Sequence, residues 1–541
     1  MNAISPLNFR TVLVMMALLL PLIFMNCAKK GMPSGGARDT IPPMVVQSVP
    51  KNFSTDFKGS EIDIFFDEYI KLNNVQQELI VSPPLQYDPF ITPLNVSKSL
   101  TIKINDTLEP NTTYVFNFGN SIVDNNEGNV LPYFKYVFST GDYIDSLSLR
   151  GRIQDARLRL PEFPATVMLY EANETYRDSI VYSEKPRYVA ITNDTTGVFE
   201  LTNLKEGTYR LIALNEKNRN YLFRPEEDKI GFVSDLITIP ADSVYVVSMF
   251  KEKPTYELAR PSLKGKQHLL IGYKGATDSL EITMLNAKPA NFSSVIFKDE
   301  TKDTLYYWYK PPIETDSLVF KVQHDQTIDT VKVKMRELYR DTLNISMINP
   351  TTIRLKDSVK LRFSTPLMHV DAEKLEIMTT DSIPVVGSVR INKKYNHGEI
   401  YFDKAEQTEY RILALPGMFT DFFGHQNDSL QFVVRTRLNS DYGTLRLTLE
   451  NAKSYPILVE LVDGNYNTVA SDYLTEPRNV FFDEINPSEY YLRIIYDRNA
   501  NGKWDTGDFL NRRHPEEVIY YPRKLDIRAN WSLNETFRLG R

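Results

Sequence analysis

The sequence predicts an all-β protein with several domains, and three observations lead to this prediction. Short runs that alternate apolar and polar residues recur between turn-rich segments, as in "SEIDIFF", "TTYVFNF" and "DSVKLRF". A period of two is typical of strands with one buried face. Aromatic residues make up 12% of the chain, which favours strands. A chain of 541 residues is also too long for a single core.

Residues 1–27 predict an export signal. One Arg precedes the apolar run "TVLVMMALLLPLIFMNC", which ends at Cys27, the only cysteine of the chain. This order is typical of a signal peptide, and the alternative of an uncleaved anchor is disfavoured by the short run and by Pro21. A cysteine directly after such a run resembles the bacterial lipobox. The resemblance implies that the Cys27 thiol is acylated and holds the protein on a membrane.

The chain then repeats itself. Residues 199–223 align with 480–504, and "NRN" in the first copy corresponds to "NAN" in the second. Upstream of each, residues 112–156 resemble 408–452. We therefore predict a duplicated two-domain unit, with a third kind of strand-rich segment at 251–340 between the copies.

The first member of each unit carries motifs of a known domain family. "SVPKNFSTDFKGSEIDIFFDEYIKL", "LEPNTTYVFNF", "DNNEGN" and "YVFSTGD" resemble the bacterial Ig-like domain of S-layer proteins. This resemblance implies Ig-like β-sandwiches at 43–142 and 341–438. The opening "GMPSGGARDTIPP" resembles that of Ig-like envelope lipoproteins from Bacteroidota, and it implies a flexible tether at 28–42.

The second member of each unit resembles a different β-sandwich. "GVFELTNLKEGTYRLIAL" is similar to the core of transthyretin-like or carboxypeptidase-regulatory-like domains. The resemblance implies such sandwiches at 143–250 and 439–541, with a divergent sandwich at 251–340 between the copies. The expected fold is thus a string of five β-sandwiches after a lipoprotein signal peptide, and these folds imply no particular reaction.

One polar stretch, "DRNANGKWDTGDF", has the ligand spacing of a calcium loop. Gly502 stands where such a loop turns sharply, but the preceding "YYLRIIY" predicts a strand rather than a helix. The first copy keeps the polar residues and has Tyr221 in place of the glycine. A self-hydrogen-bonded, Asn-rich turn is therefore the favoured interpretation and calcium the alternative. The candidate calcium ligands are Asp497, Asn499, Asn501, Lys503, Asp505 and Asp508.

An aromatic cluster in "DTLYYWYK" is a candidate contact surface. Strand alternation sends two of its four side chains to a core and two outward. An outward pair can stack on sugar rings or on a partner protein, and the alternative is a half-buried strand of the middle domain. The four residues are Tyr306, Tyr307, Trp308 and Tyr309.

Asp followed by Ser or Thr recurs along the chain. The pattern resembles the O-glycosylation acceptor of Bacteroidota envelope proteins, and turn chemistry accounts for most of its occurrences. We expect modification at a minority of sites, represented by Thr40 in the tether and Thr342 in the linker between domains.

Several function classes are excluded by the sequence. A net charge of −6 without basic runs gives no basis for nucleic-acid binding. The histidines are scattered, and no HExxH, GxSxG or phosphate-binding loop occurs. Asp67 and Glu68 in "FDEY" are adjacent on a strand, so their side chains point to opposite faces and cannot flank one substrate bond. We therefore predict no enzyme activity and no required cofactor.

Together these patterns predict a non-enzymatic envelope lipoprotein that acts as a scaffold or protein-interaction module at the outer membrane. The expected partner is an outer-membrane or periplasmic protein, and the alternative function is carbohydrate binding through the aromatic cluster. Resemblance implies acidic residues after the acylated cysteine of surface-exported lipoproteins. Ala28, Lys29 and Lys30 stand there instead, which favours the periplasmic face.

Overall fold

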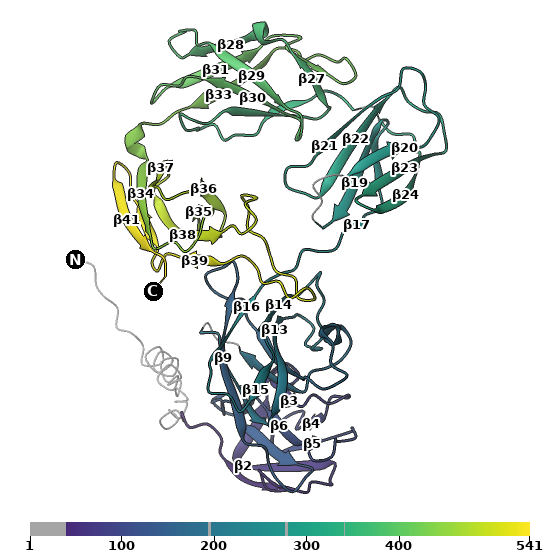
Figure 1. Ribbon diagram of the computed structural model, residues 1–541, viewed down its shortest axis with the longest axis vertical. Helices are drawn as coiled ribbons and strands as arrows, with labels where there is room; N and C mark the ends of the chain where they lie inside the picture. Colours follow the sequence, from purple (N-terminus) through teal and green to yellow (C-terminus); the bar gives the residue numbers. More distant parts are fainter. Residues whose placement is uncertain (1–38, 193–195, 276–279, 340, 541) are drawn as a thin grey trace, which may run out of the picture. The chain divides into compact units, whose positions relative to one another are not determined.

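The computed structural model describes residues 39–192, 196–275, 280–339 and 341–540 (Figure 1). Strands make up 48% of the residues and helices 3%, so the all-β prediction is confirmed. The chain divides into two compact units, residues 1–81 with 85–144 and residues 82–84 with 145–541. The predicted signal peptide and Cys27 lie outside the described residues. Within the described residues, every helix is too short or too polar to cross a membrane.

The first sandwich encloses an apolar core between two sheets. Alternation in β2 (Glu61–Leu72) directs Ile62 and Ile64 inward, where they meet Phe116 and Phe138 of the opposite sheet. A single turn of helix, α2 (Val75–Glu78), follows β2. The larger sheet has the order β1-β2-β5-β4 with β7 on β2, and comprises β1 (Val45–Val49), β2 (Glu61–Leu72), β4 (Phe90–Thr92), β5 (Ser97–Lys103) and β7 (Ile122–Asp124). The other sheet comprises β3 (Ile80–Ser82), β6 (Thr113–Asn117) and β8 (Lys135–Ser139).

The second sandwich has one sheet that is buried on both faces. All but the last residue of β10 are buried, because one face packs on the sandwich core and the other is covered from outside. This sheet has the order β11-β10-β13-β14 with β15 on β13, and comprises β10 (Ala165–Glu171), β11 (Tyr188–Thr192), β13 (Gly207–Asn215), β14 (Lys229–Phe232) and β15 (Ile237–Ile239). The other sheet comprises β9 (Leu147–Asp155), β12 (Val198–Leu204) and β16 (Tyr245–Met249), and a 3-10 helix, η1 (Asp178–Tyr182), follows β10.

The fifth sandwich repeats this strand order. Its last strand pairs in parallel with its first, β41 with β34, as β16 does with β9 in the second sandwich. One sheet has the order β36-β35-β38-β39 with β40 on β38, and comprises β35 (Ile457–Val462), β36 (Thr468–Leu474), β38 (Ser488–Tyr496), β39 (Val518–Tyr520) and β40 (Leu525–Ile527). The other comprises β34 (Gly443–Glu450), β37 (Val480–Ile485) and β41 (Ser532–Arg538).

The third sandwich also packs two sheets over one core (Figure 1). Its larger sheet has the order β17-β19-β22-β21 with β18 on β19, and comprises β17 (Glu257–Leu258), β18 (Ser262–Gly265), β19 (His268–Lys274), β21 (Ser293–Lys298) and β22 (Thr304–Lys310). The smaller sheet comprises β20 (Glu281–Met284), β23 (Ser317–His324) and β24 (Thr327–Lys334).

The fourth sandwich has the strand order of the first. The set β25-β26-β30-β29 corresponds to β1-β2-β5-β4, and β28-β31-β33 corresponds to β3-β6-β8. Its strands are β25 (Ile345–Met347), β26 (Val359–Phe363), β27 (Leu367–Val370), β28 (Leu375–Thr379), β29 (Gly387–Asn392), β30 (His397–Phe402), β31 (Glu409–Ala414), β32 (Phe419–Asp421) and β33 (Leu430–Arg435). Two 3-10 helices, η2 (Ala372–Lys374) and η3 (Asn439–Asp441), lie within and after it.

Candidate interaction site

The polar turn singled out by the sequence lies in the connection between β38 and β39. Asp497 is 2% exposed, and its carboxylate accepts hydrogen bonds from the backbone N–H of Asn501 at 3.2 Å and of Gly502 at 2.7 Å. The side-chain amides of Asn499 and Asn501 both donate to Asp505 Oδ2 at 2.6 Å. The structure thus brings four of the six candidate ligands together as a hydrogen-bonded turn.

The other two candidate ligands take part in separate contacts. Lys503 donates its backbone N–H to Asn501, and Asp508 accepts two hydrogen bonds from Asn511. In the described part of the chain, no three carboxylate, imidazole or thiol side chains are grouped so that they could hold a metal ion. The hydrogen bonds are those of a polar turn, and calcium binding at this turn stays a prediction.

Beyond the turn, the same connection reaches the second sandwich, which belongs to the same compact unit. Phe509 is 1% exposed, and its ring centroid lies 5.4 Å from that of Phe232. The His514 ring stacks on the same Phe232 ring, with the two centroids 4.3 Å apart. We call residues 504–514 the clasp and the apolar cluster that receives Phe509 the socket. The socket consists of Met168, Tyr170, Val181, Ile212, Leu214, Phe223, Ile230, Phe232 and Phe250.

Polar contacts hold the clasp against residues 251–253, which follow the last strand of the second sandwich. The backbone N–H of Phe509 donates to Glu252 at 2.6 Å, and Thr506 Oγ1 donates to the Lys251 carbonyl at 2.6 Å. Lys253 Nζ lies 2.8 Å from Asp505 Oδ1. Buried backbone and carboxylate groups are therefore satisfied across the contact, as a stable protein interface requires.

An ion-pair cluster lies at the edge of the socket. Arg512 Nε is 2.8 Å from Asp178 Oδ2, and the buried Arg210 guanidinium is 3.6 Å from the same carboxylate. Burial by itself would raise the pKa of Asp178, but hydrogen bonds from Arg512 and Tyr176 and the charge of Arg210 hold it below the usual value. Asp178 is therefore ionised at neutral pH and offers a fixed negative charge to the clasp.

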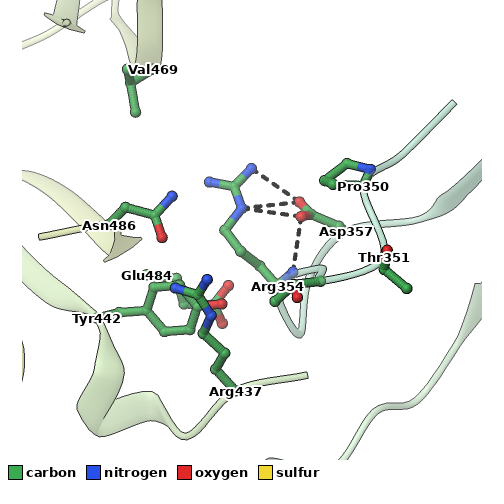
Figure 2. A pocket seen from close by; sticks show the side chains of 10 residues that line it. Pro350, Thr351, Arg354, Asp357, Arg437, Tyr442, Val469, Glu484 and Asn486 are labelled. Atoms are coloured by element: carbon green, nitrogen blue, oxygen red, sulfur yellow. Dashed lines mark hydrogen bonds and ion pairs between the residues drawn. The ribbon is translucent and has the colours of Figure 1, made fainter. Parts of the chain in front are cut away.

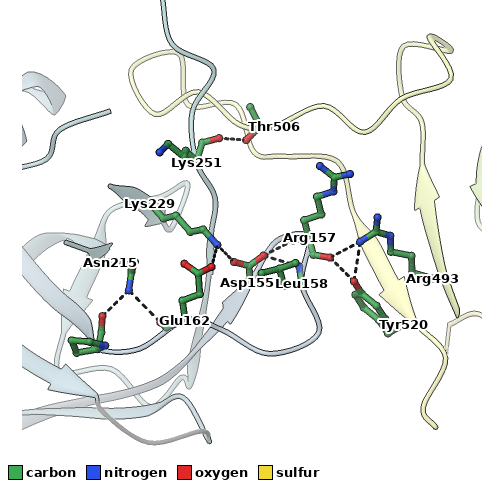
Figure 3. A network of polar contacts seen from close by, with 11 residues as sticks. Asp155, Arg157, Leu158, Glu162, Asn215, Lys229, Lys251, Arg493, Thr506 and Tyr520 are labelled. Carbon is green, nitrogen blue, oxygen red and sulfur yellow. Dashed lines mark hydrogen bonds and ion pairs between the residues drawn. The ribbon is translucent and has the colours of Figure 1, made fainter. Parts of the chain in front are cut away.

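The second sandwich contacts the fifth in return (Figure 3). The Arg157 carbonyl accepts hydrogen bonds from the Tyr520 hydroxyl at 2.7 Å and from the Arg493 guanidinium at 3.5 Å. Asp155 holds this segment in place, because it accepts the backbone N–H of Arg157 and pairs with Lys229 at 2.7 Å. Each sandwich thus covers part of a sheet of the other.

A crevice of about 610 Å³ lies along this contact. Its charged side chains are paired, since Lys453 binds Glu517 and the Arg498 side chain donates to the His514 carbonyl. Glu516 accepts two backbone N–H groups, from Arg498 and Asp505. The acidic side chains that line the crevice are thus held in ion pairs and hydrogen bonds of the contact itself.

A second crevice of about 590 Å³ lies between the fourth and fifth sandwiches (Figure 2). Arg354 pairs with Asp357 at 3.0 Å on one side, and Arg437, Tyr442 and Glu484 lie on the other. Burial opposes ionisation of Asp357, but hydrogen bonds from Arg354 hold its pKa below the usual value. Asp357 is therefore ionised at neutral pH and holds the Arg354 side chain at this crevice.

Of the four aromatic residues at 306–309, two are predicted to point outward, and the structure leaves only Tyr306 of these partly exposed. Tyr307, Trp308 and Tyr309 are at most 2% exposed. Tyr307 and Tyr309 point into the core, as alternation predicts. Trp308 faces the other way, where the His268 ring stacks on it at 3.8 Å and Phe423 of the fourth sandwich packs against its edge.

Tyr306 is half-buried and donates its hydroxyl to Asp299 at 2.7 Å. The outward face of β22 is therefore covered by a neighbouring strand and by another sandwich, which the local sequence does not reveal. Within residues 306–309 of the described chain, the structure therefore does not present a pair of exposed rings to a sugar.

The two candidate modification sites are exposed. Thr40 lies before the first strand, and Thr342 lies between the third and fourth sandwiches. The Thr342 hydroxyl accepts a hydrogen bond from Asn344 at 3.3 Å. Modification of either hydroxyl stays a prediction.

The contact between the two sandwiches is not predicted from the sequence. Phe509 ends the polar stretch "DRNANGKWDTGDF" and Asp178 is one of the recurring Asp-Ser positions, but neither pattern indicates a contact between domains, and Arg512 belongs to no motif. One signal was available: the connection that carries the clasp has 21 residues, 497–517, whereas its equivalent in the second sandwich has 13, 216–228. An extension of a loop between otherwise similar copies is a common sign of an added contact.

Comparison with known proteins assigns a class to the first sandwich. Residues 39–140 match the family model of the bacterial Ig-like domain. No curated protein matches the chain.

Comparison with solved structures finds matches of low identity. Surface layer protein SbsC, domains 1–6, is 11% identical over 90% of this chain and 67% of that one, with a TM-score of 0.16. The eight N-terminal Ig domains of Down syndrome cell adhesion molecule are 10% identical over 90% and 70%, with a TM-score of 0.15. The Escherichia coli adhesin FdeC is 9% identical over 68% and 98%, with a TM-score of 0.14.

Proposed function

We propose that this protein is a non-enzymatic envelope lipoprotein that serves as a scaffold or protein-interaction module at the outer membrane. The observation that carries the proposal is the contact between the second and fifth sandwiches, in which a loop of one copy completes the apolar surface of the other. Such a contact joins repeated domains into one support. The carbohydrate-binding alternative is not retained, because the aromatic rings it needs are covered.

The first sandwich offers the surface that we expect to meet a partner. Its larger sheet ends in the edge strands β1 and β4. Val46, Phe90 and Leu94, on or next to these edges, expose at least half of their surface. Unpaired strand edges with exposed apolar side chains are suited to adding a strand from another protein. The expected partner is an outer-membrane or periplasmic protein that contributes an extended segment.

The predicted anchor places this surface close to a membrane. Acylation of Cys27 and a tether at 28–42 would hold the first sandwich near the lipid headgroups. The basic residues Lys29 and Lys30 after the cysteine support the periplasmic face of the outer membrane. Thr40 is available for a glycan next to this sandwich, since its side chain is exposed.

The proposal is tested by purifying the full chain with its lipid from detergent-solubilised membranes and identifying proteins that accompany it. We expect a stoichiometric partner that is lost in the variant Val46→Lys/Phe90→Lys. The matched control is Leu236→Lys, because Leu236 is an exposed apolar residue of the second sandwich. Purification of the unaltered chain without any partner would contradict the scaffold role.

Calcium at the polar turn has its own test. Binding to the folded state raises the unfolding temperature in proportion to the logarithm of free calcium. If calcium, the alternative to a purely hydrogen-bonded turn, binds here, the unfolding temperature of the fifth sandwich rises on adding calcium and falls with a chelator, and Asp505→Ala abolishes the difference. An unchanged transition would leave the polar turn without a metal role.

A further inference from the structure

We propose that the clasp is exchanged between two copies of the chain, so that the socket of one molecule receives the clasp of another. Such exchange goes beyond the scaffold role, because it names a second copy of this chain as a partner and assigns the surface. It rests on the closed contact between the second and fifth sandwiches and not on the edge strands of the first sandwich.

The socket is incomplete without a clasp. Phe509 is almost fully buried among socket residues, although it belongs to another sandwich. The clasp backbone at Gly507 lies so close to the socket that an added Cβ would be 2.6 Å from the Phe250 ring. The same Cβ would be 2.7 Å from the Arg513 carbonyl. A molecule whose clasp is displaced therefore exposes a contiguous apolar surface, which water disfavours. Either its own clasp or that of another molecule must cover this surface.

The clasp and the socket are separate pieces of one chain. Residues 251–442 connect them and include the third and fourth sandwiches, each with its own core. A hinge motion at the joints between sandwiches can part the clasp from the socket while every sandwich stays folded. A chain with two complementary surfaces joined by a connector can close on itself or pair with a second copy.

Concentration decides between the two forms. Closure within one chain is favoured when the effective concentration of the clasp near its own socket exceeds that of other chains. Confinement to a membrane raises the local concentration of neighbouring molecules. Exchange therefore becomes favourable where the protein is crowded, and it links molecules without any new contact.

The charges at the edge of the socket permit a selective test. The variant Phe509→Asp/Arg512→Asp has a clasp that cannot bind a socket, while its own socket is unchanged. Asp178→Arg prevents the socket from binding a clasp, because it places positive charge against Arg512 and Arg210. The clasp of this variant is unchanged. Neither variant can form the native contact alone, but a mixture contains one intact clasp and one intact socket on different chains.

We expect each full-length variant alone to have the mass of one chain by light scattering in detergent. Their mixture should give a species with the mass of two chains and one copy of each. Should Asp178→Arg not fold by circular dichroism, Ser234→Arg replaces it, since exposed Ser234 contacts His514 of the clasp at 2.6 Å.

Two results would overturn the proposal. One is a mixture in which both folded variants remain single chains. The other is a dimer formed equally by the clasp-deficient variant alone, which would place the interface elsewhere. Neither result bears on the outer-membrane partner, because the test for that partner detects a different protein bound to the first sandwich.

Discussion

The two copies of the polar turn are built alike although their sequences differ. Glu216 in the second sandwich accepts the backbone N–H groups of Asn220 and Tyr221, each at 3.1 Å. Asp497 in the fifth sandwich accepts the N–H groups of the residues at the same spacing, Asn501 and Gly502. Tyr221 and Gly502 share a left-handed backbone, with φ of 62° and 73°. Both turns therefore share an acidic side chain that accepts two backbone amides at the same spacing.

The copies differ in the path of the chain after the turn. In the second sandwich the chain returns at once, and Phe223 packs into the apolar cluster of its own sandwich. In the fifth sandwich the aligned residue, Trp504, begins the clasp, and Phe509 fills the same cluster from outside. The comparison teaches that the hydrogen bonds of the turn set the local shape, while a longer connection adds a contact between copies.

Truncation of the clasp anchor should have the largest effect. Phe509→Ala removes a buried aromatic side chain and is expected to weaken the closed contact by about 3–5 kcal/mol. Hydrogen exchange at the clasp and at β14 should rise accordingly. The adjacent Leu510 is half exposed, so Leu510→Ala serves as the matched control and should change exchange little. Equal effects of the two substitutions would show that Phe509 does not anchor the contact.

The two polar turns should differ in how pH affects the stability of their sandwiches. Burial raises the pKa of Glu216 to about 7, more than the two amide hydrogen bonds lower it. Because the folded pKa lies above the unfolded value of 4.5, the folded state binds the proton more tightly. The stability that this proton contributes is complete below pH 4.5 and is lost as the pH rises to about 7. The loss is of the order of 3 kcal/mol.

Glu216→Gln should remove most of this dependence from the unfolding of the second sandwich. The measurement is urea unfolding at a series of pH values between 4 and 8, followed by a fluorophore on that sandwich. If the free energy of unfolding of the variant still falls as the pH rises, another group is responsible for the titration.

The two charged residues at the edge of the socket, Asp178 and Arg512, should contribute unequally to the stability of the closed contact. Asp178 is half-buried and pairs with the buried Arg210, so Asp178→Asn leaves a buried guanidinium without its carboxylate and is expected to cost about 3 kcal/mol. The Arg512 side chain is 55% exposed, and Arg512→Gln should cost at most about 1 kcal/mol. Protease sensitivity of the clasp measures both. A larger effect for Arg512 would mean that the ion pair, rather than Phe509, determines closure.

How far the sequence predicts the structure depends on the range of the interactions. Alternation in "EIDIFF" correctly predicts which side chains of β2 are buried, since that pattern is local. The spacing from Asp497 to Asp505 correctly predicts a compact polar turn for the same reason. The exposure of Trp308 is predicted wrongly, because His268 and Phe423 cover it from distant positions. The pairing of Phe509 with Phe232 joins residues far apart in the chain, and no local pattern encodes it.

The smallest effect concerns the left-handed position of the turn. Gly502 has open space around the position of a Cβ, so Gly502→Ala meets no clash and costs only backbone strain, roughly 1 kcal/mol. Gly464 of the same sandwich also has open space but an ordinary φ, and Gly464→Ala should be neutral or slightly stabilising. Hydrogen exchange between residues 497 and 505 compares the two variants. Since Tyr221 already bears this strain in the other copy, equal behaviour of both variants would imply that the acidic residue alone holds the turn.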